Sequence, residues 1–314
     1  MANVNMIVLG GPGSGKTTLA AWLDRQITQE QQVCKGLAIC RAAEKVRPGQ
    51  YSEALACTEQ YFSSQNPEMF RETGNGVPMY IKTEYSPELN GKTLGFNMSL
   101  VDPGTYDFER VDHINQAYDL VKNSQIILIT IDTPRLMEEM DHYFDEDTDY
   151  KKYNRIREIT MIVMRALRNS RDRRLVLFVP MKCEHYYHDD RMKEVNRAVK
   201  DVYCELFEFL DDEGIASVTA PAIVPIMTLG GAVFDHFDEA GKACYRKTEM
   251  GYQPTYAEHV LLLCQQYLLC QVQHYRKNPK EAKLRFGKTV DCRCSAAALM
   301  KAKADIGSYL DGHD

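Results

Sequence analysis

Residues 6–18 run from an apolar segment directly into a glycine-rich turn, and this junction constrains the fold more than any other part of the chain. The apolar segment Met-Ile-Val-Leu has the composition of a buried strand. It is followed by Gly10-x4-Gly15-Lys16-Thr17 and then by a predicted helix over residues 16–28. A strand, such a turn and a helix in succession form a unit in which backbone N–H groups surround a phosphate. We call residues 10–17 the P-loop.

The residue types in the P-loop suit a phosphate site. Its glycines let the backbone wrap closely around a polyphosphate, because a Cβ would obstruct the approach. Lys16 is expected to reach the β- and γ-phosphates, and the Thr17 hydroxyl is expected to bind Mg²⁺. The positive end of the helix dipole faces the same anion. The predicted nucleotide contacts on this side are Gly10, Gly11, Pro12, Gly13, Ser14, Gly15, Lys16, Thr17 and Thr18.

Composition excludes several other classes of protein. The chain has 314 residues, 44% of them hydrophobic, and no apolar run long enough to span a bilayer. We therefore expect an intracellular, cytoplasmic protein without a signal peptide or membrane segment. A formal net charge of −6 argues against a dedicated nucleic-acid binder. The ten cysteines lack CxxC pairs, which predicts reduced thiols, and Cys292-x-Cys294 has no second pair with which to form a metal site.

The part of the chain before Asp102 is predicted to contain an insertion and a hairpin. Residues 34–76 show no clear core strand and are long enough to form a helical insertion. Residues 77–85 and 92–102 have strand patterns, and Asn90-Gly91 between them is a strong hairpin signal. We therefore expect these two strands to be antiparallel.

Beyond Asp102, helical and apolar strand patterns alternate. Helices are expected near 108–122, 153–168, 190–210 and 256–275, and strands at 126–131, 175–180 and 216–227. This alternation predicts an α/β P-loop NTPase fold, a three-layer sandwich with a mostly parallel central sheet and one antiparallel hairpin strand. The predicted domain covers residues 1–275, with a loop-rich insertion at 230–253. A basic, irregular tail over residues 276–314 follows it.

A second acidic element is expected beside the P-loop. The strand that ends at residue 102 leads into Asp102-Pro103-Gly104. An aspartate at the tip of a central strand can hold Mg²⁺ through water, and the N–H of the following glycine can contact a γ-phosphate. We therefore expect Asp102 to join Thr17 at a Mg²⁺ site, with Gly104 at the γ-phosphate. A turn or helix-capping aspartate is the alternative interpretation of Asp102.

The strand at 175–180 ends in Pro180-Met181-Lys182-Cys183-Glu184. With a P-loop, a hairpin, Asp-x-Gly and then Lys-x-acid in this order, residues 4–231 resemble the Ras-like GTPases of the translation-factor-related class. The divergent pattern is most similar to the bacterial double-GTPase-type proteins of conflict and defence gene clusters. The resemblance implies that the Lys182 stem packs on a purine and that the Glu184 carboxylate reads the guanine N1–H and amino group. It places Thr228, in segment 225–230, at the guanine oxygen.

Three departures from that family pattern bear on the nucleotide. Met181 stands where the family has Asn or Thr, Glu184 is one methylene longer than the usual Asp, and Asp102-Pro103-Gly104 is one residue shorter than Asp-x-x-Gly. The resemblance implies GTP as the nucleotide. Because of these three departures, ATP stays open as the alternative.

The resemblance also implies Mg²⁺-dependent hydrolysis of the γ-phosphate. Proteins of this class place a threonine on Mg²⁺ just before the second strand, and Thr73 is the candidate here, with Thr83 a poorer one inside a predicted strand. Thr105, and not a water-orienting glutamine, follows Gly104. We therefore expect slow intrinsic turnover, accelerated by a protein partner or by self-association.

Two other functions stay open. The Gly10–Lys16 segment resembles the loop of adenylate kinases as closely as that of GTPases, so a small-molecule or nucleotide kinase is one alternative. Such a kinase usually has an arginine-bearing lid, for which the candidates are Arg165, Arg168, Arg171, Arg173 and Arg174. The other alternative is a nucleotide-gated interaction module with negligible turnover, which signals by ordering segments for a partner.

Overall fold

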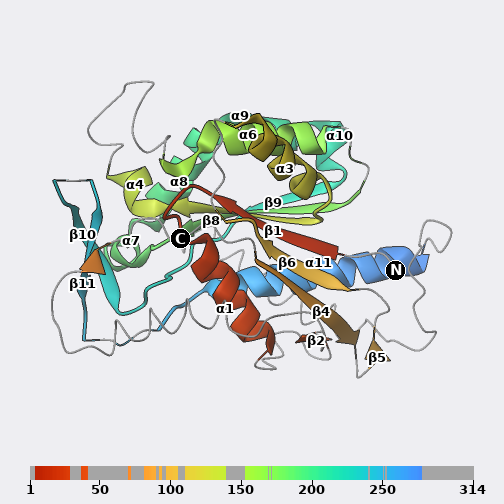
Figure 1. Cartoon of the computed structure of the whole chain (residues 1–314), viewed down its shortest axis with the longest axis horizontal. Coiled ribbons are helices and arrows are strands. Elements are labelled where there is room, and N and C mark those ends of the chain that lie inside the picture. The colour runs from red at the N-terminus through yellow and green to blue at the C-terminus, as the bar shows by residue number, and fades with distance from the viewer. Residues whose placement is uncertain are drawn as a thin grey trace.

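A twisted sheet with helices on both faces forms the body of the protein (Figure 1). The structure is a computed structural model. It describes residues 4–28, 37–41, 70–71, 81–89, 92–93, 97–104, 110–138, 153–168, 170, 172–239, 241–249, 251 and 253–277.

The strands of the main sheet run in the order β2-β4-β6-β1-β7-β8-β9. Their bounds are β1 Val4–Gly10, β2 Leu37–Arg41, β4 Ile81–Leu89, β6 Met98–Asp102, β7 Ile126–Asp132, β8 Arg174–Met181 and β9 Thr219–Ile223. β6, β1, β7, β8 and β9 are parallel, and β4 is antiparallel to both of its neighbours. The parallel strands β1, β6, β7 and β8 are apolar almost throughout, because helices cover both faces of the sheet.

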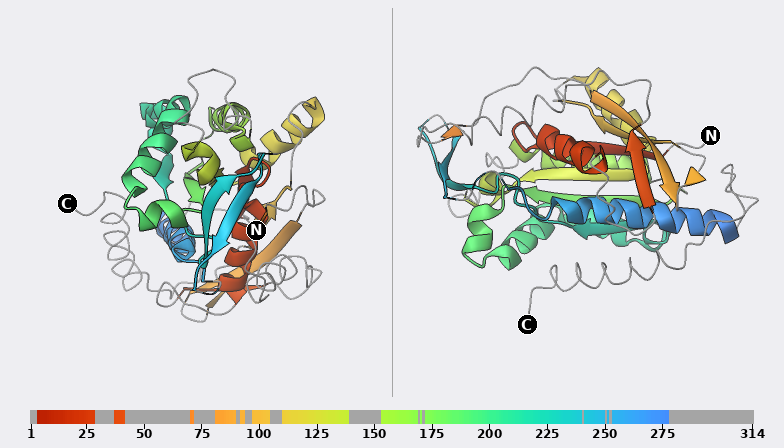
Figure 2. Two further views of the ribbon diagram at one scale, coloured as in Figure 1. Left: turned by 90° about the vertical axis from the view of Figure 1, so that its left-hand side faces the viewer. Right: turned by 90° about the horizontal axis from the view of Figure 1, so that it is seen from below.

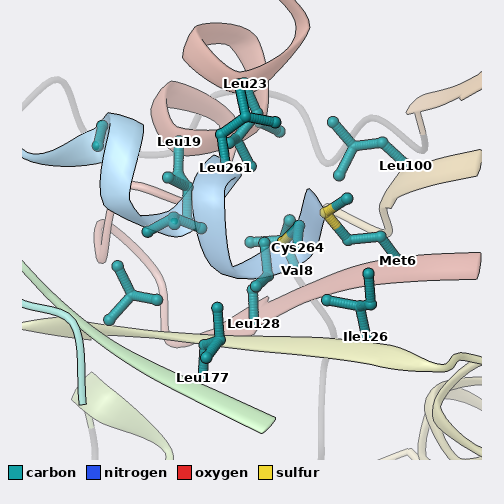
Figure 3. Packing of buried hydrophobic residues seen from close by; sticks show 14 of the residues in the cluster. Met6, Val8, Leu19, Leu23, Leu100, Ile126, Leu128, Leu177, Leu261 and Cys264 are labelled. Atoms are coloured by element: carbon teal, nitrogen blue, oxygen red, sulfur yellow. The ribbon is translucent and has the colours of Figure 1, made fainter. Parts of the chain in front are cut away.

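Each face of the sheet has its own core. α1 Lys16–Thr28 and α11 Ala257–Lys277 cover one face, where Met6 and Val8 of β1 pack with Leu19, Leu23 and Leu261 of the two helices (Figure 3). The intervening residues of β1, Ile7 and Leu9, point to the opposite core, as the two-residue period of a strand requires. The longer helices that contribute to that second core are α3 Val111–Lys122, α6 Ile156–Leu167, α8 Met192–Val202 and α9 Cys204–Asp211.

Three short helices complete the main body: α4 Thr133–Met137, α7 Glu184–His188 and α10 Glu213–Ala216. In the part of the chain that the structure describes, no helix is both long enough and apolar enough to cross a bilayer.

A second, smaller sheet lies at the end of the molecule where α4 and α7 are found (Figure 2). It consists of β10 Ala232–Phe237, β11 Ala243–Lys247 and β3 Phe70–Arg71, all antiparallel. Phe234 and Tyr245 form its apolar core with Leu229 and two alanines. The sequence-based expectation of a loop-rich insertion at 230–253 is therefore wrong, because most of this insertion is a β-hairpin. We call residues 232–247 the β10–β11 hairpin.

The structure confirms the antiparallel strand pair before Asp102. β4 pairs with β6, with Ile81 opposite Asp102. The short strand β5, Lys92–Thr93, pairs with the end of β4, so the chain reverses between residues 89 and 92, where Asn90-Gly91 was expected to turn.

Other expectations need correction. β2 lies inside segment 34–76, where no strand was expected, and adds an edge strand to the sheet. The helix predicted over 190–210 is two helices, α8 and α9, which meet at Tyr203. Apart from β2 and β3, the segment of the predicted helical insertion at 34–76 lies outside the described residues, as does the tail beyond residue 277.

Candidate nucleotide site

The P-loop lies at the carboxyl end of the central strand. β1 ends at Gly10 and α1 begins at Lys16. On either side of β1, the parallel strands β6 and β7 end in Asp102 and Asp132. The carboxyl ends of parallel strands form the crevice in which α/β sheets bind their ligands.

The shape of the P-loop is held by the protein itself. The Ser14 hydroxyl lies 2.9 Å from the Gly11 carbonyl oxygen, to which it donates, and 2.7 Å from the Thr130 hydroxyl of β7. Gly15 has φ +90°, and a Cβ there would lie 2.8 Å from the Met181 methyl group. The backbone conformation therefore favours glycine at this position, while the methyl end of the flexible Met181 side chain could shift to make space.

Lys16 is a buried cation. Its side chain is 7% exposed, and its Nζ donates to the carbonyl oxygens of Gly11 (2.7 Å) and Gly10 (3.1 Å). Among the described residues it forms no ion pair with a carboxylate. Burial lowers the pKa of Lys16 to about 8, against a smaller opposing effect of Asp102. A bound anion would supply the missing countercharge, so this site fits a phosphate.

Thr17 and Asp102 meet beside the P-loop. The Thr17 Oγ1 donates to Asp102 Oδ2 at 2.7 Å, and Asp102 Oδ1 accepts from the Gly104 N–H at 3.0 Å. Asp102 is fully buried. A hydroxyl and a carboxylate are the hard oxygen ligands that suit Mg²⁺, which commonly binds through few protein groups together with substrate phosphates. The two residues therefore fit the predicted Mg²⁺ site, and the turn contact with Gly104 also satisfies the alternative interpretation of Asp102.

The residues predicted to surround the base lie together. The Lys182 N–H donates to Thr228 Oγ1 at 2.9 Å, which joins the end of β8 to the loop after β9. Glu184 Oε1 accepts from the N–H groups of Leu229 (2.5 Å) and Gly230 (3.0 Å) in the same loop. The two segments that the sequence predicts on the base side are thus in direct contact.

The side chains of Lys182 and Glu184 face protein groups. Lys182 Nζ forms an ion pair with Asp132 Oδ2 at 2.7 Å, and its backbone is left-handed with φ +61°. Tyr245 of β11 lies over the same ammonium, 5.7 Å from ring centroid to Nζ. Lys182 is 9% exposed and Glu184 is 1% exposed. Burial raises the pKa of Glu184 to about 7, although the two loop N–H groups oppose this effect. The roles of Lys182, Glu184 and Thr228 toward a base stay predictions.

The predicted Mg²⁺ threonine, Thr73, lies outside the described residues. Thr83 is buried within β4, as its strand pattern indicates. Pro12 lies in the P-loop and Thr18 in the first turn of α1, both half-buried.

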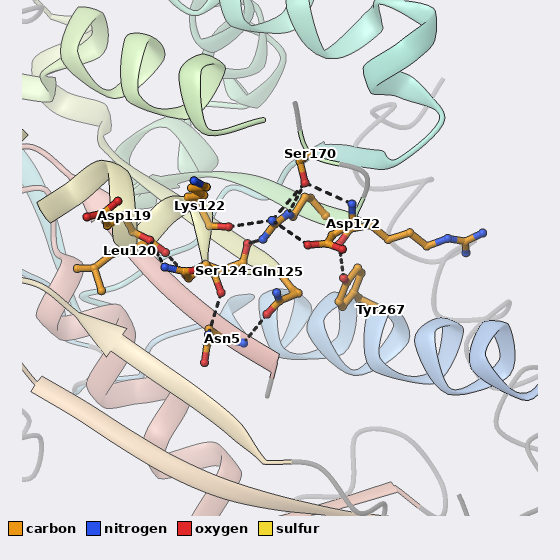
Figure 4. Close-up of polar contacts among 12 residues, drawn as sticks. Asn5, Asp119, Leu120, Lys122, Ser124, Gln125, Ser170, Asp172 and Tyr267 are labelled. Atoms are coloured by element: carbon orange, nitrogen blue, oxygen red, sulfur yellow. Dashed lines mark hydrogen bonds and ion pairs between the residues drawn. The ribbon is translucent and has the colours of Figure 1, made fainter. Parts of the chain in front are cut away.

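The structure contradicts the arginine lid of the kinase alternative. Arg174 begins β8, and its guanidinium donates to the carbonyl oxygens of Lys122 (2.9 Å) and Ser124 and to Ser170 Oγ (Figure 4). Because β8 is parallel to β7 and β1, this cluster lies at the opposite end of the sheet from the P-loop. Arg165 stacks on Tyr118, 4.4 Å from the ring centroid. Arg171 lies outside the described residues.

Three residues of this region were missed by the sequence analysis: Asp132, Arg135 and Tyr245. Asp132 ends an apolar strand in the same way as Asp102, so its position alone could have marked it as a candidate. Arg135 and Tyr245 carry no such signal, because their positions depend on contacts between distant segments.

Comparison with known proteins gives a distant structural likeness only. No family model matches the chain, and no curated protein matches it. Among solved structures it is similar to an ADP-ribosylation-factor-like GTP-binding protein, the small COPII coat GTPase SAR1 from Encephalitozoon cuniculi in complex with GDP. The two share 10% identity over 72% of this chain and 69% of that chain, with a TM-score of 0.32.

The fold and the P-loop together define the class of this protein. It is an α/β protein with a P-loop, a mostly parallel sheet with one antiparallel strand and helices on both faces. The strand order β4-β6-β1-β7-β8-β9 and the P-loop after β1 carry this statement, and β2 extends the sheet at its edge.

Proposed function

We propose that this protein binds Mg²⁺ and a nucleoside triphosphate, GTP in preference to ATP, and hydrolyses the γ-phosphate slowly as a switch for a partner protein. One observation carries the proposal: the buried ammonium of Lys16, which forms no ion pair among the residues that the structure describes, beside the hydrogen bond between Thr17 and Asp102. A buried cation next to two hard oxygen ligands is an arrangement for a metal-bound polyphosphate.

Each residue of the P-loop side has a defined task in this proposal. The backbone N–H groups of residues 13–16 and the Lys16 ammonium bind and orient the phosphates, which is most of what phosphoryl transfer asks of a protein. Thr17 and Asp102 would hold Mg²⁺, which when bound neutralises charge on the phosphates. Gly104 donates to Asp102 in this structure and would offer its N–H to the γ-phosphate; Thr73 is proposed as a further Mg²⁺ ligand.

The preference for guanine rests on Glu184. An ionised carboxylate is an acceptor only, so it pairs with the N1–H and amino group of guanine. Adenine has an unprotonated N1, which the same carboxylate would repel. Lys182 would contribute its aliphatic stem as a packing surface for the purine.

A place in the cytoplasm is a further part of the proposal, and the lack of a long apolar run in the sequence supports it. A role in a bacterial defence system is also proposed, and its support is the resemblance of the divergent motif pattern over residues 4–231 to the family described above.

Single-turnover hydrolysis of GTP with and without Mg²⁺ tests the proposal. We expect Mg²⁺-dependent hydrolysis slower than about one turnover per minute, since Thr105 and not a water-orienting glutamine follows Gly104. Lys16→Ala should abolish it, with Lys193→Ala, an exposed lysine of α8, as the control. Turnover of many GTP molecules per second by the isolated protein would contradict the slow switch, and tight GTP binding without any hydrolysis would favour the interaction module.

A further inference from the structure

The base side of the candidate site is closed by the protein. Lys182 and Glu184 are almost fully buried by other parts of the protein. The aromatic ring of Tyr245, in the β10–β11 hairpin, covers the Lys182 ammonium, and the N–H groups of Leu229 and Gly230, at the start of the same insertion, occupy one oxygen of Glu184. Of these contacts, the hairpin itself supplies the one that covers Lys182, so a purine that packs on Lys182 requires the hairpin to move away from it.

Arg135 fixes the hairpin in this closed position. Its guanidinium lies between two aromatic rings, 3.6 Å from the centroid of Tyr153 and 5.0 Å from that of Phe237 in β10. It also donates to the carbonyl oxygen of Gly241 at the hairpin turn, at 2.8 Å. A buried guanidinium stacked between rings and bonded to a carbonyl is a strong and directional contact.

The same arginine is tied to both halves of the nucleotide site. Its backbone N–H donates to Asp132 Oδ1, and the other oxygen of that carboxylate holds Lys182. On the phosphate side, the backbone of Tyr153 lies so close to the P-loop that a Cβ at Gly11 would be 1.5 Å from the Tyr153 carbonyl oxygen. Arg135 therefore contacts the hairpin, the base-side ion pair and the neighbour of the P-loop at once.

The connections of the hairpin suit a hinge. The insertion leaves the main body at Gly230 and returns at Gln253, and these two residues are packed against each other: a Cβ at Gly230 would lie 2.3 Å from the Gln253 backbone. Gly230 has φ +65°, a conformation that glycine adopts without strain. A bridge between Met227 and Thr255 closes the base of the insertion. Because both ends meet at one point, a movement of the hairpin about that point would leave β9 and α11 in place, and β3 would move with β11 or separate from it.

We propose that the β10–β11 hairpin is a gate over the base side of the nucleotide site and that Arg135 is the positioning residue that holds it shut. The proposal rests on the proposed nucleotide-binding function and adds the element that controls entry and release. β11 also pairs with β3, which directly precedes the segment of the predicted Mg²⁺ threonine in the sequence. A purine nucleotide therefore exchanges only from the fraction of molecules in which the hairpin is open.

Nucleotide exchange kinetics of the full chain test the gate. Stopped-flow mixing with N-methylanthraniloyl-GDP gives the association and dissociation rates, and binding of tripolyphosphate reports on the P-loop alone. In this proposal the hairpin shuts equally over the free and the nucleotide-bound site, so each rate is proportional to the open fraction. In Arg135→Ala we therefore expect both rates to rise about tenfold, with the dissociation constant nearly unchanged. The affinity for tripolyphosphate should equal that of the wild type.

Arg165→Ala is the matched control, because Arg165 also stacks on a tyrosine ring but lies between α6 and α3. It should exchange GDP at the wild-type rate. Phe237→Ala provides a second test that leaves Arg135 in place, and it decides the question if Arg135→Ala fails to fold by circular dichroism. Here too we expect faster exchange.

The outcomes separate the two proposals. Wild-type exchange rates in folded Arg135→Ala, or in Phe237→Ala, would overturn the gate while leaving nucleotide binding intact. Wild-type protein that binds tripolyphosphate but no nucleotide would overturn the base site and the gate with it. Wild-type protein that binds neither would overturn the proposed function itself.

Discussion

At the scale of single residues, the protonation of Lys16 should depend on whether a phosphate is bound. Its pKa of about 8 in the free protein lies below the usual value of 10.5 because the side chain is buried. A bound phosphate favours the ammonium, so binding above pH 8 requires uptake of a proton. We expect tripolyphosphate affinity to fall about tenfold per pH unit above pH 8 and to be level below it.

Lys16→Arg isolates this effect, because a guanidinium stays charged throughout the range. Its tripolyphosphate affinity should lack the fall above pH 8, after allowance for the titration of tripolyphosphate itself. Identical pH profiles for the two proteins in isothermal titration would show that Lys16 does not face the anion.

On the base side, Glu184 should give a pH dependence of nucleotide affinity in the opposite direction. Burial raises its pKa to about 7, so the free protein protonates this carboxyl below that pH. Guanine requires the ionised form, and binding below pH 7 must therefore release a proton. We expect the affinity for GDP to fall about tenfold per unit as the pH is lowered from 7.

Glu184→Gln should bind GDP more weakly but with no change in affinity between about pH 5.5 and pH 7. ADP titrations in the same buffers control for effects on the phosphates. A wild-type GDP affinity that is level over this interval would exclude Glu184 as the guanine reader.

At the scale of elements, the contact between β6 and α1 is the one that should respond to metal. Asp102 at the tip of β6 hydrogen-bonds to Thr17 in the first turn of α1. Asp102→Asn keeps a polar side chain there but loses the charge, so the gain in GDP affinity that Mg²⁺ gives should fall by about 10–100-fold. With EDTA the variant and the wild type should bind alike. Asp112→Asn, at an exposed ion pair, is the control. If Asp102→Asn keeps the full gain in GDP affinity from Mg²⁺, Asp102 does not help to bind the metal.

The contact between β8 and the end of α3 has a structural task instead. Arg174 satisfies the carbonyl oxygens of Lys122 and Ser124 from a buried position. Arg174→Met should lower the free energy of unfolding by about 2–4 kcal/mol in urea denaturation, because these acceptors lose a charged donor. Arg173→Met, at the exposed neighbour, should change it little. Loss of tripolyphosphate binding in folded Arg174→Met would instead revive the lid of the kinase alternative.

The strands that sequence analysis missed share a physical cause. β2 reads Leu-Ala-Ile-Cys-Arg and pairs with β4, more than forty residues further along the chain, with no turn signal between them. β10 and β11 do carry a local signal: the aromatic pattern of Val233-Phe234-x-x-Phe237, the glycine turn at 241 and then Cys244-Tyr245. Glycine and acidic residues surround this pattern and are typical of loops, so the strand signal is weak. The strands that helices cover on both faces were predicted well. These strands are buried on both sides, so their sequences are apolar almost throughout.

At the scale of the whole molecule, sequence order predicts which end of the sheet holds the site but not whether that site is open. Asp102, Lys182 and Thr228 follow the ends of three strands, and parallel strands bring those ends to one edge. Lys182 is covered by its ion pair with Asp132 and by the ring of Tyr245. Tyr245 belongs to a hairpin later in the chain, which packs against the end of β8. No local pattern encodes such a contact, and it is the feature that most changes how the molecule would take up a nucleotide.

Titration of nucleotide-free protein with GTP, GDP, ATP and ADP in the presence of Mg²⁺ tests the central claim most directly, with Lys16→Ala and Glu184→Ala in parallel. The account predicts that the wild type prefers guanine nucleotides, that Lys16→Ala binds none of the four tightly, and that Glu184→Ala binds but loses the preference. Adenine preference, or a guanine preference that survives in Glu184→Ala, would contradict the assigned base site. Equal binding by Lys16→Ala and the wild type would contradict the nucleotide site as a whole.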